Sequence, residues 1–495
     1  MTAAVMIIAA SDSGCGAGIA ADIFTARDFG VFPVTAETGV TCQTSEGCFG
    51  VSPVPAEFVL ETIQRLDGDF SPAAVKIGLI PDRQILDAVI EGIEGIRKKH
   101  PVFVVADPVS SASAGGIMSG LVKDDYLRLF SACDLVTPNV PELEMLTGAR
   151  ISCPDDLGNA AVSLASGLGG TSVLAKGGHI RGEYVFDFLL TSGYSAWFGE
   201  PYFDHCNKHG TGCTLSSAIA SAMADNYDLN DAAALAEAYV TGGLSDALQI
   251  GHGPGPVRHD GLSQAFGCLP FINEETPSVR RYPEFPRCPA RLGLYPVMPD
   301  LEWLERVLRA GVKTAQLRIK DRNDPCLFEK IQKAAELGKK YDACVFIDDH
   351  WEMAIEAGAY GVHLGQEDLL TADLGRISKA GLRLGVSTHG WYELSKAIAL
   401  RPSYIALGHI FDTKTKKMKS KAQGIDRLRL FAGAVGDIPT VAIGGLSGRR
   451  FYDAVNTGVG SVACVTAITE SPDPEQQIRE YMSAFEISRE GSQVK

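Results

Sequence analysis

The segment Thr314-Ala-Gln-Leu-Arg-Ile-Lys320 is a short apolar run that ends in polar and basic residues. It is one of eight such runs between Leu292 and Val465, and helical patterns fill most of the gaps between them. This alternation predicts an eightfold β/α barrel, whose chemistry gathers at the carboxyl ends of its strands. The predicted barrel strands are Leu292–Val297, Thr314–Lys320, Cys344–Asp349, Gly361–Gly365, Arg383–Thr388, Tyr404–Ile410, Thr440–Gly445 and Ser461–Val465.

Charged residues gather at the ends of the second, third and fourth runs. Gln316, Arg318 and Lys320 alternate, so we expect them on one face of a strand. Two cations and an amide aimed at one spot are costly to bury without an anion, and a diphosphate would supply it. Asp349 and Asp368 end neighbouring runs, and their oxygens suit a hard cation such as Mg²⁺. The sequence therefore predicts a site for a diphosphate and a metal.

A second anion site is expected at the ends of the last three runs. Barrels commonly hold a phosphate after the seventh and eighth strands. The candidate residues are Thr413, Thr415, Lys416, Gly445, Val465 and Thr466.

Several of these residues have simpler interpretations, which the sequence leaves open. Ser387 or Thr388 could cap a helix, and the lysines around Lys416 could be solvated. Asp348 could be a structural partner of Lys320. His363 and His409 lie on predicted strands and are expected to be packed in the core or to support ligands rather than to be ligands themselves.

The length of 495 residues predicts at least two domains. Asn273–Pro289 is rich in proline and charge without periodicity, which is typical of a linker. We assign residues 1–270 to a first domain, 271–289 to the linker and 290–495 to the barrel.

The first domain alternates apolar strands with amphipathic helices, which favours a mainly parallel sheet covered on both faces, an α/β/α sandwich. Two further runs, Tyr184–Leu190 and Ala196–Phe203, predict an antiparallel hairpin at one edge. The predicted parallel strands are Val5–Ala10, Val34–Thr41, Val75–Leu79, Val102–Ala106, Leu135–Thr137 and Val173–Ala175. The predicted helices are Pro55–Leu66, Gln84–Lys99, Asp155–Ser166, Gly212–Met223 and Asp231–Ala247.

The loop Asn207-Lys-His-Gly-Thr-Gly-Cys213 runs into an apolar helix. Gly210, Thr211 and Gly212 can turn their backbone N–H groups inward, beside the positive end of that helix, to hold a phosphoryl group. Cys213 would then face the acceptor hydroxyl. A thiol beside a helix N-terminus is expected to have a lowered pKa, so Cys213 is a candidate base.

Two further strand ends carry polar groups. In Thr137-Pro-Asn139-Val-Pro-Glu142, the Asn and Glu could hold a metal–triphosphate, or they could simply form a helix start. Lys176 precedes two glycines, so it could reach nucleotide phosphates or lie in a surface turn.

The composition of the chain disfavours nucleic acids and membranes as partners. The net charge of −15 disfavours nucleic acid and anionic membranes. No run is long enough to span a bilayer, and the first run, Val5–Ala10, lacks the basic flank of a secretory signal. The twelve cysteines include no CxxC pair, so we expect a reducing, cytoplasmic location.

The N-terminal motifs together resemble the ribokinase superfamily, and within it hydroxymethylpyrimidine (phosphate) kinase. The matching stretches are Ser11–Asp22, Thr41-Cys-Gln-Thr44, Val75-Lys-Ile-Gly-Leu79, Asp107-Pro-Val109, the Asn207–Cys213 loop and Gly251–Pro256. The resemblance implies that Gln43, Asp22 and Val109 bind the pyrimidine, and that Asn139, Glu142 and Lys176 serve ATP and Mg²⁺. Ser13, Gly14 and Cys15 depart from the family's Pro-Ser-Gly, which leaves activity on pyridoxine-like alcohols open.

The C-terminal runs resemble thiamine phosphate synthase. The matching stretches are Thr314–Asp321, Tyr360–Asp368, Arg383–His389, Pro402–His409 and Pro439–Gly445. The resemblance implies that the pyrimidine diphosphate is bound by Gln316, Arg318, Lys320, Asp348, Ser387 and Lys416. Asp348 stands where the family usually has Asn.

The two resemblances predict a bifunctional enzyme of thiamine biosynthesis. The first half would make the pyrimidine diphosphate that the second half couples to a thiazole phosphate. We expect each module to self-associate, as its relatives do. The alternatives are a pyridoxal-type kinase fused to a thiazole tautomerase-like barrel, and a ligand-sensing regulator built from inactive enzyme folds.

Overall fold

The computed structural model describes residues 2–110, 118–205, 207–413 and 420–491. The chain divides into two compact units, Met1–Arg280 and Arg281–Lys495. The predicted fold class is confirmed for both: an α/β sandwich comes first and a closed barrel follows.

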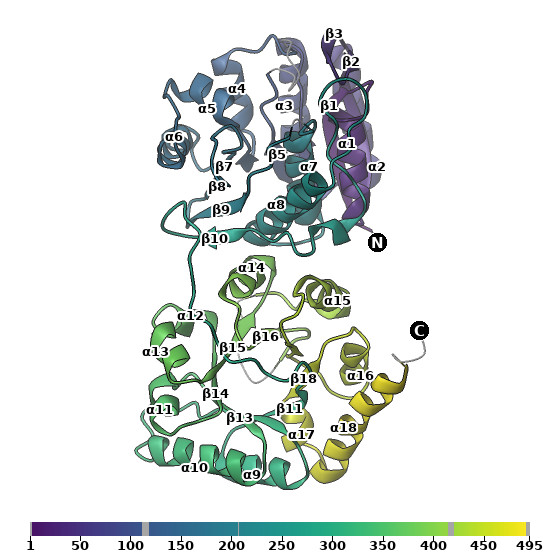
Figure 1. Ribbon diagram of the computed structural model, residues 1–495. Coiled ribbons are helices and arrows are strands. Elements are labelled where there is room, and N and C mark those ends of the chain that lie inside the picture. The colour runs from purple at the N-terminus through teal and green to yellow at the C-terminus, as the bar shows by residue number, and fades with distance from the viewer. Residues whose placement is uncertain (1, 111–117, 206, 414–419, 492–495) are drawn as a thin grey trace. The chain divides into compact units, whose positions relative to one another are not determined.

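The first unit is built on a ten-stranded sheet (Figure 1) with the order β10-β9-β8-β7-β6-β5-β4-β1-β2-β3. The strands from β7 to β2 pair in parallel, and both edges end in antiparallel pairs. The strands are β1 (Ala4–Ser11), β2 (Phe32–Thr44), β3 (Gly47–Pro53), β4 (Ala74–Ile77), β5 (Phe103–Ala106), β6 (Leu135–Val136), β7 (Ser172–Ala175), β8 (Tyr184–Leu190), β9 (Ser195–Pro201) and β10 (Phe271–Asn273).

Helices cover both faces of this sheet because alternate strand residues point to opposite sides. Met6 and Ile8 of β1 pack with the helices from α2 to α6, whereas Ile7 and Ala9 pack against Ile19 of α1. The helices are α1 (Gly18–Asp28), α2 (Ala56–Phe70), α3 (Arg83–Arg97), α4 (Lys123–Phe130), α5 (Val140–Thr147), α6 (Pro154–Ser166), α7 (Thr211–Ala224) and α8 (Leu229–Ser245), with a 3-10 turn at Leu262–Ala265.

Helices α1 and α4 and strands β3 and β10 of this unit were not predicted, and of α5 only the start was predicted, as one of two interpretations. Helix α1 follows a glycine-rich loop and has no side-chain cap at Ala17, so no start signal marks it. Strand β2 runs past the predicted end at Thr41 and turns back into β3, which pairs with it antiparallel. The predicted hairpin at the other edge is confirmed as β8 and β9.

The second unit closes eight parallel strands into a barrel ringed by helices (Figure 1). All eight predicted runs contain a strand, but β12 ends at Leu317, so Arg318 and Lys320 lie beyond it and the predicted shared strand face is wrong for them. The strands are β11 (Gly293–Met298), β12 (Thr314–Leu317), β13 (Cys344–Asp348), β14 (Gly361–Leu364), β15 (Arg383–Thr388), β16 (Tyr404–Leu407), β17 (Thr440–Ala442) and β18 (Ser461–Cys464).

The outer ring of the barrel begins with α9 after the first strand and ends with the C-terminal helix α18. The helices are α9 (Leu301–Arg309), α10 (Leu327–Lys340), α11 (Trp351–Glu356), α12 (Gln366–Leu369), α13 (Leu374–Lys379), α14 (Trp391–Leu400), α15 (Gly424–Ala434), α16 (Arg449–Val455), α17 (Thr466–Thr469) and α18 (Pro474–Gly491).

The last part of the proline-rich segment is bonded to the barrel. Ser378 Oγ donates to the carbonyl of Glu284 at 2.5 Å, and Ser403 Oγ donates to that of Pro286 at 2.6 Å. The next cysteine, Cys288, is buried in the barrel core. This stretch therefore belongs structurally to the second unit.

A buried ion pair joins α1 to the centre of the first sheet. Lys76 Nζ on β4 lies 2.7 Å from an oxygen of Asp22, and both side chains have no exposed surface. Ser217 Oγ of α7 donates to the other oxygen of Asp22 at 2.6 Å. Burial opposes the charge on Lys76, but the Asp22 carboxylate outweighs it and raises the lysine's pKa. The pair thus ties three elements together.

We predict that Lys76→Met destabilises the first unit by about 3–5 kcal/mol, because it leaves the Asp22 carboxylate buried without a cation. Urea denaturation followed by hydrogen exchange of the β4 and α1 amides measures this. The control is Arg65→Met, which removes a pair whose side chains are 81% and 62% exposed and should cause no measurable change. Equal stability of the two variants would contradict the prediction.

Candidate active sites

A cavity of about 520 Å³ lies in the first unit where the carboxyl ends of the parallel strands meet α7. It brings together nearly all the residues that the sequence singled out. Those lining it are Gln43, Val109, Asn139, Glu142, Lys176, Gly210, Thr211, Gly212 and Cys213. Asp22 is the exception, because it lies behind the wall, where it holds Lys76.

One end of this cavity is formed by the start of α7. Gly210 has φ +83°, and a Cβ there would collide with the carbonyl oxygen of Gly16. The close approach packs the glycine-rich loop before α1 against the loop before α7. The first residues of α7 line the cavity, and the first N–H groups of a helix have no intrahelical partners, so this helix start is suited to an anion.

Lys176 is the cation at this end. Its Nζ lies 2.6 Å from Asp107 Oδ1, and its side chain is only 13% exposed, so the surface-turn interpretation is wrong. Burial opposes its charge, yet the carboxylates of Asp107 and Glu142 raise its pKa. Asn139 and Glu142 form a reciprocal capping box at the start of α5, which confirms the helix-start interpretation, and both line the cavity. Their contact with a metal–triphosphate stays a prediction. Burial raises the pKa of Glu142 to about 7.

The expectation of a low thiol pKa for Cys213 is wrong. Burial raises the pKa of Cys213 to about 11, although nearby Lys76 acts in the opposite direction. In this ligand-free state the thiol is therefore protonated at neutral pH. Desolvation outweighs the helix terminus, which the sequence pattern could not show.

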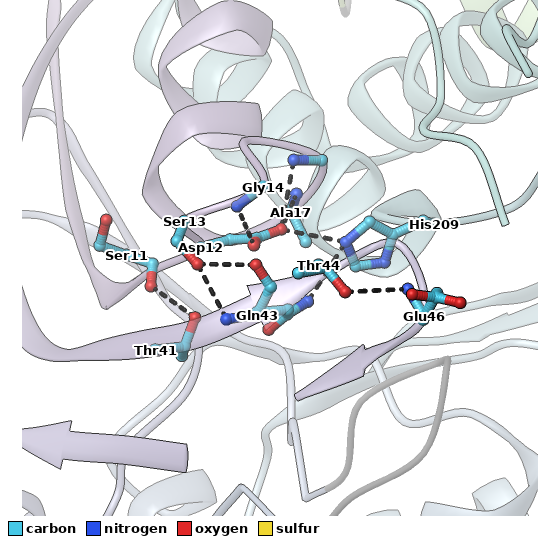
Figure 2. Close-up of polar contacts among 11 residues, drawn as sticks. Ser11, Asp12, Ser13, Gly14, Ala17, Thr41, Gln43, Thr44, Glu46 and His209 are labelled. Carbon is cyan, nitrogen blue, oxygen red and sulfur yellow. Dashed lines mark hydrogen bonds and ion pairs between the residues drawn. The ribbon is translucent and has the colours of Figure 1, made fainter. Parts of the chain in front are cut away.

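Next to the start of α7, Gln43 contacts His209, which in turn contacts Asp12 (Figure 2). His209 Nε2 lies 3.0 Å from Asp12 Oδ2 and 3.3 Å from Gln43 Nε2. Backbone N–H groups of Gly14 and Ala17 donate to the same Asp12 carboxylate. These bonds and His209 lower the pKa of Asp12 despite its burial. Asp12 and His209 were present in the matching stretches but received no role from the sequence.

The lining also includes apolar residues, among them Val185 and Leu244, and three acidic residues. Burial raises the pKa values of these three carboxyl groups: Asp187 to about 6, and Glu200 and Glu237 well above the usual value. No motif in the sequence marked them, since they are single acids on a strand pair and a helix.

In the barrel, Asp348 at the end of β13 accepts hydrogen bonds from two of the side chains that were predicted to bind a diphosphate. Gln316 Nε2 donates to one carboxylate oxygen, and Arg318 Nε donates to the other at 2.9 Å. Although strand β12 ends between them, the two side chains thus point to one place. We call Gln316 and Arg318 the anion receptor, and the Asp348 carboxylate occupies the position at which they would bind an anion. Lys320 lies in the loop that follows β12.

Asp349 and Asp368 come together beside this receptor. Arg322 bridges them, with 3.0 Å to Asp368 and 3.7 Å to Asp349. Burial and the neighbouring Asp368 raise the pKa of Asp349. Such mutual repulsion is what a divalent cation would relieve. Within the described ranges, no group of three His, Cys, Asp or Glu side chains could hold a metal alone. Arg322 was not predicted.

Ser387 does not cap a helix, since the N-cap residue of α14 is Gly390, which has no side-chain cap. Ser387 Oγ lies 2.8 Å from His363 Nε2, while His363 and His409 are both buried. The candidates for the second anion site follow β16, β17 and β18: Thr413, Gly445 and Val465 lie in loops, and Thr466 is the first residue of α17. Thr415 and Lys416 fall outside the described residues.

Comparison with known proteins identifies the families to which the two units are similar. Residues 294–468 match the family model of thiamine monophosphate synthase. Over 189 residues the chain is 58% identical to the thiamine-phosphate synthase of Serratia proteamaculans (strain 568), which covers 38% of this chain and 89% of that protein. The chain belongs to the thiamine-phosphate synthase family. The synthase of Citrobacter koseri is 55% identical over 191 residues, or 39% of this chain and 90% of that protein.

The kinase half is identified in the same way. Residues 12–258 match the family model of phosphomethylpyrimidine kinase. A pyridoxal kinase from Staphylococcus aureus, solved with pyridoxal, covers 55% of this chain and 99% of its own at 22% identity, with a TM-score of 0.50. That likeness shows the kinase fold alone. The chain is a bifunctional enzyme of thiamine biosynthesis, with ATP as the kinase's phosphoryl donor, and the pyridoxal-kinase alternative is disfavoured. No helix in the described ranges has the length and apolarity to cross a membrane.

We predict that Cys213 of the ligand-free kinase domain reacts with iodoacetamide far more slowly at pH 7 than the exposed Cys15, Cys42 and Cys326. Its raised pKa keeps the thiol protonated, so its reactivity should increase as the pH approaches 11. Peptide mass spectrometry after timed alkylation at pH 7 and pH 9.5 measures this. Preferential labelling of Cys213 at pH 7 would show that its pKa is low.

Proposed function

We propose that the first cavity phosphorylates hydroxymethylpyrimidine and then its monophosphate. The support is the set of groups that line one cavity. It holds polar side chains of Gln43, Asp12 and His209, the start of α7 with Cys213, and apolar residues such as Val185 and Leu244 that can contact a nucleotide base. A heteroaromatic alcohol and ATP would thus meet at Gly210–Cys213.

In this proposal the substrate oxygen attacks the γ-phosphorus of ATP, and the bond to the ADP oxygen breaks in line. Lys176 and the N–H groups at the start of α7 stabilise the charge on the transferred phosphoryl oxygens. Cys213 can accept the substrate proton only as the thiolate, a form that its burial opposes and the nearby Lys76 favours. Mg²⁺, held through Asn139 and Glu142, would neutralise the triphosphate.

The barrel rim is proposed to couple the pyrimidine diphosphate to a thiazole phosphate. The observation that carries this is the preformed receptor in which Gln316 and Arg318 both donate to one carboxylate. The carbon–oxygen bond to the diphosphate breaks, and the leaving group takes both electrons. The thiazole nitrogen then donates its lone pair to the methylene cation. Arg318, Lys320 and Lys416 stabilise the departing diphosphate, and Thr413, Thr415, Gly445, Val465 and Thr466 hold the thiazole phosphate.

The synthase domain is also proposed to use Mg²⁺. Asp349 and Asp368 fit this ion because they are close to each other, carry oxygen ligands and both interact with Arg322. When bound, the ion would neutralise part of the diphosphate charge.

The cytoplasmic location and the homo-oligomeric state are also proposals. All cysteines that the structure describes are free thiols, which supports a location in the reducing cytoplasm. A homo-oligomer is proposed because the relatives that the sequence resembles self-associate.

We predict that the purified chain, given hydroxymethylpyrimidine, ATP, Mg²⁺ and thiazole phosphate, makes thiamine monophosphate. Lys176→Ala should abolish product from hydroxymethylpyrimidine but not from its diphosphate. Arg318→Ala should reduce coupling at least a hundredfold while sparing phosphorylation, because it removes a charged contact to the leaving group. Mass spectrometry follows both products.

The two variants control for each other's folding, since each should retain one activity. Absence of thiamine monophosphate from the wild-type mixture would end the proposal. Equal loss of both activities in either variant would contradict two separate sites.

We predict that Asp349→Asn raises the Mg²⁺ concentration for half-maximal coupling roughly tenfold or more, by removing a charged ligand. The Mg²⁺ requirement of phosphorylation should not change. Because the pKa of Asp349 is raised, protons compete with the metal, and the wild-type requirement should grow as pH falls. Metal titrations of both activities at two pH values measure this, and an unaltered requirement for coupling would remove Asp349 from the metal site.

A further inference from the structure

Four side chains form a continuous chain of hydrogen bonds from the barrel interior to its rim. Tyr295 Oη of β11 lies 2.8 Å from Tyr404 Oη of β16, which lies 2.7 Å from His363 Nδ1 of β14. His363 Nε2 in turn lies 2.8 Å from Ser387 Oγ of β15. The two tyrosines are at most 1% exposed, whereas Ser387 is half-buried and lies at the carboxyl end of its strand.

The direction in which each of these hydrogen bonds is donated follows from Tyr295, the buried end of the four-residue chain. The structure offers Tyr295 Oη no hydrogen-bond partner besides Tyr404 within its described ranges. If the protons pointed inward, with Ser387 donating to His363, then Tyr404 would donate to Tyr295 and the Tyr295 proton would have no acceptor. A buried donor without an acceptor costs about 1–3 kcal/mol. If the protons point outward, every buried hydroxyl proton is bonded.

Ionisation does not offer another solution. Burial raises the pKa of both Tyr295 and Tyr404 well above the usual value, so both stay neutral phenols. An imidazolium at His363 would donate to Tyr404 and again force the Tyr295 proton to remain unbonded. It would also place a charge in the barrel core. The outward direction therefore requires neutral His363 with its proton on Nε2.

The position of Tyr404 is fixed by its neighbours. Its ring packs edge-on against Phe346 at 5.0 Å between centroids and lies nearly parallel to the ring of His363. A Cβ at Gly385, on the neighbouring strand β15, would collide with the Tyr404 ring and hydroxyl. Glycine at this position thus leaves space for the hydroxyl that directs His363. Gln366 Nε2 donates to the Ser387 carbonyl at 2.6 Å and fixes the other end.

We propose that Tyr404 and His363 are positioning residues that make Ser387 a hydrogen-bond donor to the diphosphate of the pyrimidine substrate. His363 Nε2–H donates to Ser387 Oγ, so the serine's own proton is directed away from the histidine, toward the rim. An anion needs a donor there, and a free serine hydroxyl could equally turn its proton toward the histidine. The inference rests on the proposed coupling reaction. It adds how buried residues of the barrel core make Ser387 a hydrogen-bond donor at the site.

The kinetic test compares two tyrosine variants that each remove one hydroxyl from the same core. Tyr404→Phe deprives His363 of its donor, so the imidazole can hold its proton on Nδ1 and accept from Ser387. We expect the KM for the pyrimidine diphosphate to rise about tenfold, as in Ser387→Ala, with no further loss in the double variant. Tyr295→Phe leaves Tyr404 with His363 as its acceptor, so the KM should stay within about twofold. Equal effects of the two variants, or additive effects of Tyr404→Phe and Ser387→Ala, would overturn the proposal.

The second readout does not depend on the reaction. In the full chain labelled with ¹⁵N-histidine, the His363 signals, assigned by their loss in His363→Gln, should report a proton on Nε2. Tyr404→Phe should shift them toward Nδ1 protonation, and Tyr295→Phe should not. A wild-type Nδ1 proton would refute the inference even if coupling occurs. The expected tautomer without any thiamine monophosphate formation would instead refute the proposed function. Unchanged phosphorylation shows only that the first unit is intact, and unchanged His363 signals in Tyr295→Phe show that the barrel tolerates loss of a core hydroxyl.

Discussion

Parallel pairing of strands is the constraint on which both halves of this enzyme depend. It places the carboxyl ends of neighbouring strands at one edge, so that side chains far apart in sequence meet there. Asp107 follows β5 and Lys176 follows β7, yet they bond at 2.6 Å. In the barrel, Arg318 follows β12 and Asp348 ends β13, and the same geometry joins them. Sites for highly charged substrates can therefore be assembled from single residues on successive strands.

A second theme is that three cations at or beside the two sites, the buried Lys76 and Lys176 and the partly exposed Arg318, are paired with carboxylates. Lys76 is held by Asp22, Lys176 by Asp107 and Arg318 by Asp348. Without these partners the cations would be costly to bury. A phosphate that enters either site must therefore compete with a carboxylate or join it through a metal. Asp348 is the clearest case, because it stands where relatives usually carry a neutral asparagine.

The sequence predicted the barrel, the sandwich and the residues of the kinase cavity because each depends on local patterns. Apolar runs marked the strands, and the loop Asn207–Cys213 marked the start of α7. The pattern failed where a property depends on surroundings. The thiol pKa of Cys213 is set by burial, and helix α1 has no capping signal to announce it. The role inferred for Tyr404 needs hydrogen-bond partners from three other strands, which no spacing in one chain segment can show.

The segment before the barrel bears on how such fusions are made. Glu284, Pro286 and Arg287 use their backbone carbonyls to receive bonds from Ser378, Ser403 and Arg383, near the amino ends of the barrel strands. Residues that read as a spacer thus serve as a plug for the face opposite the site. A gene for the barrel alone that starts at residue 290 would omit this plug and leave Cys288's place in the core empty. The boundary between the two compact units accordingly lies upstream of these residues, between Arg280 and Arg281.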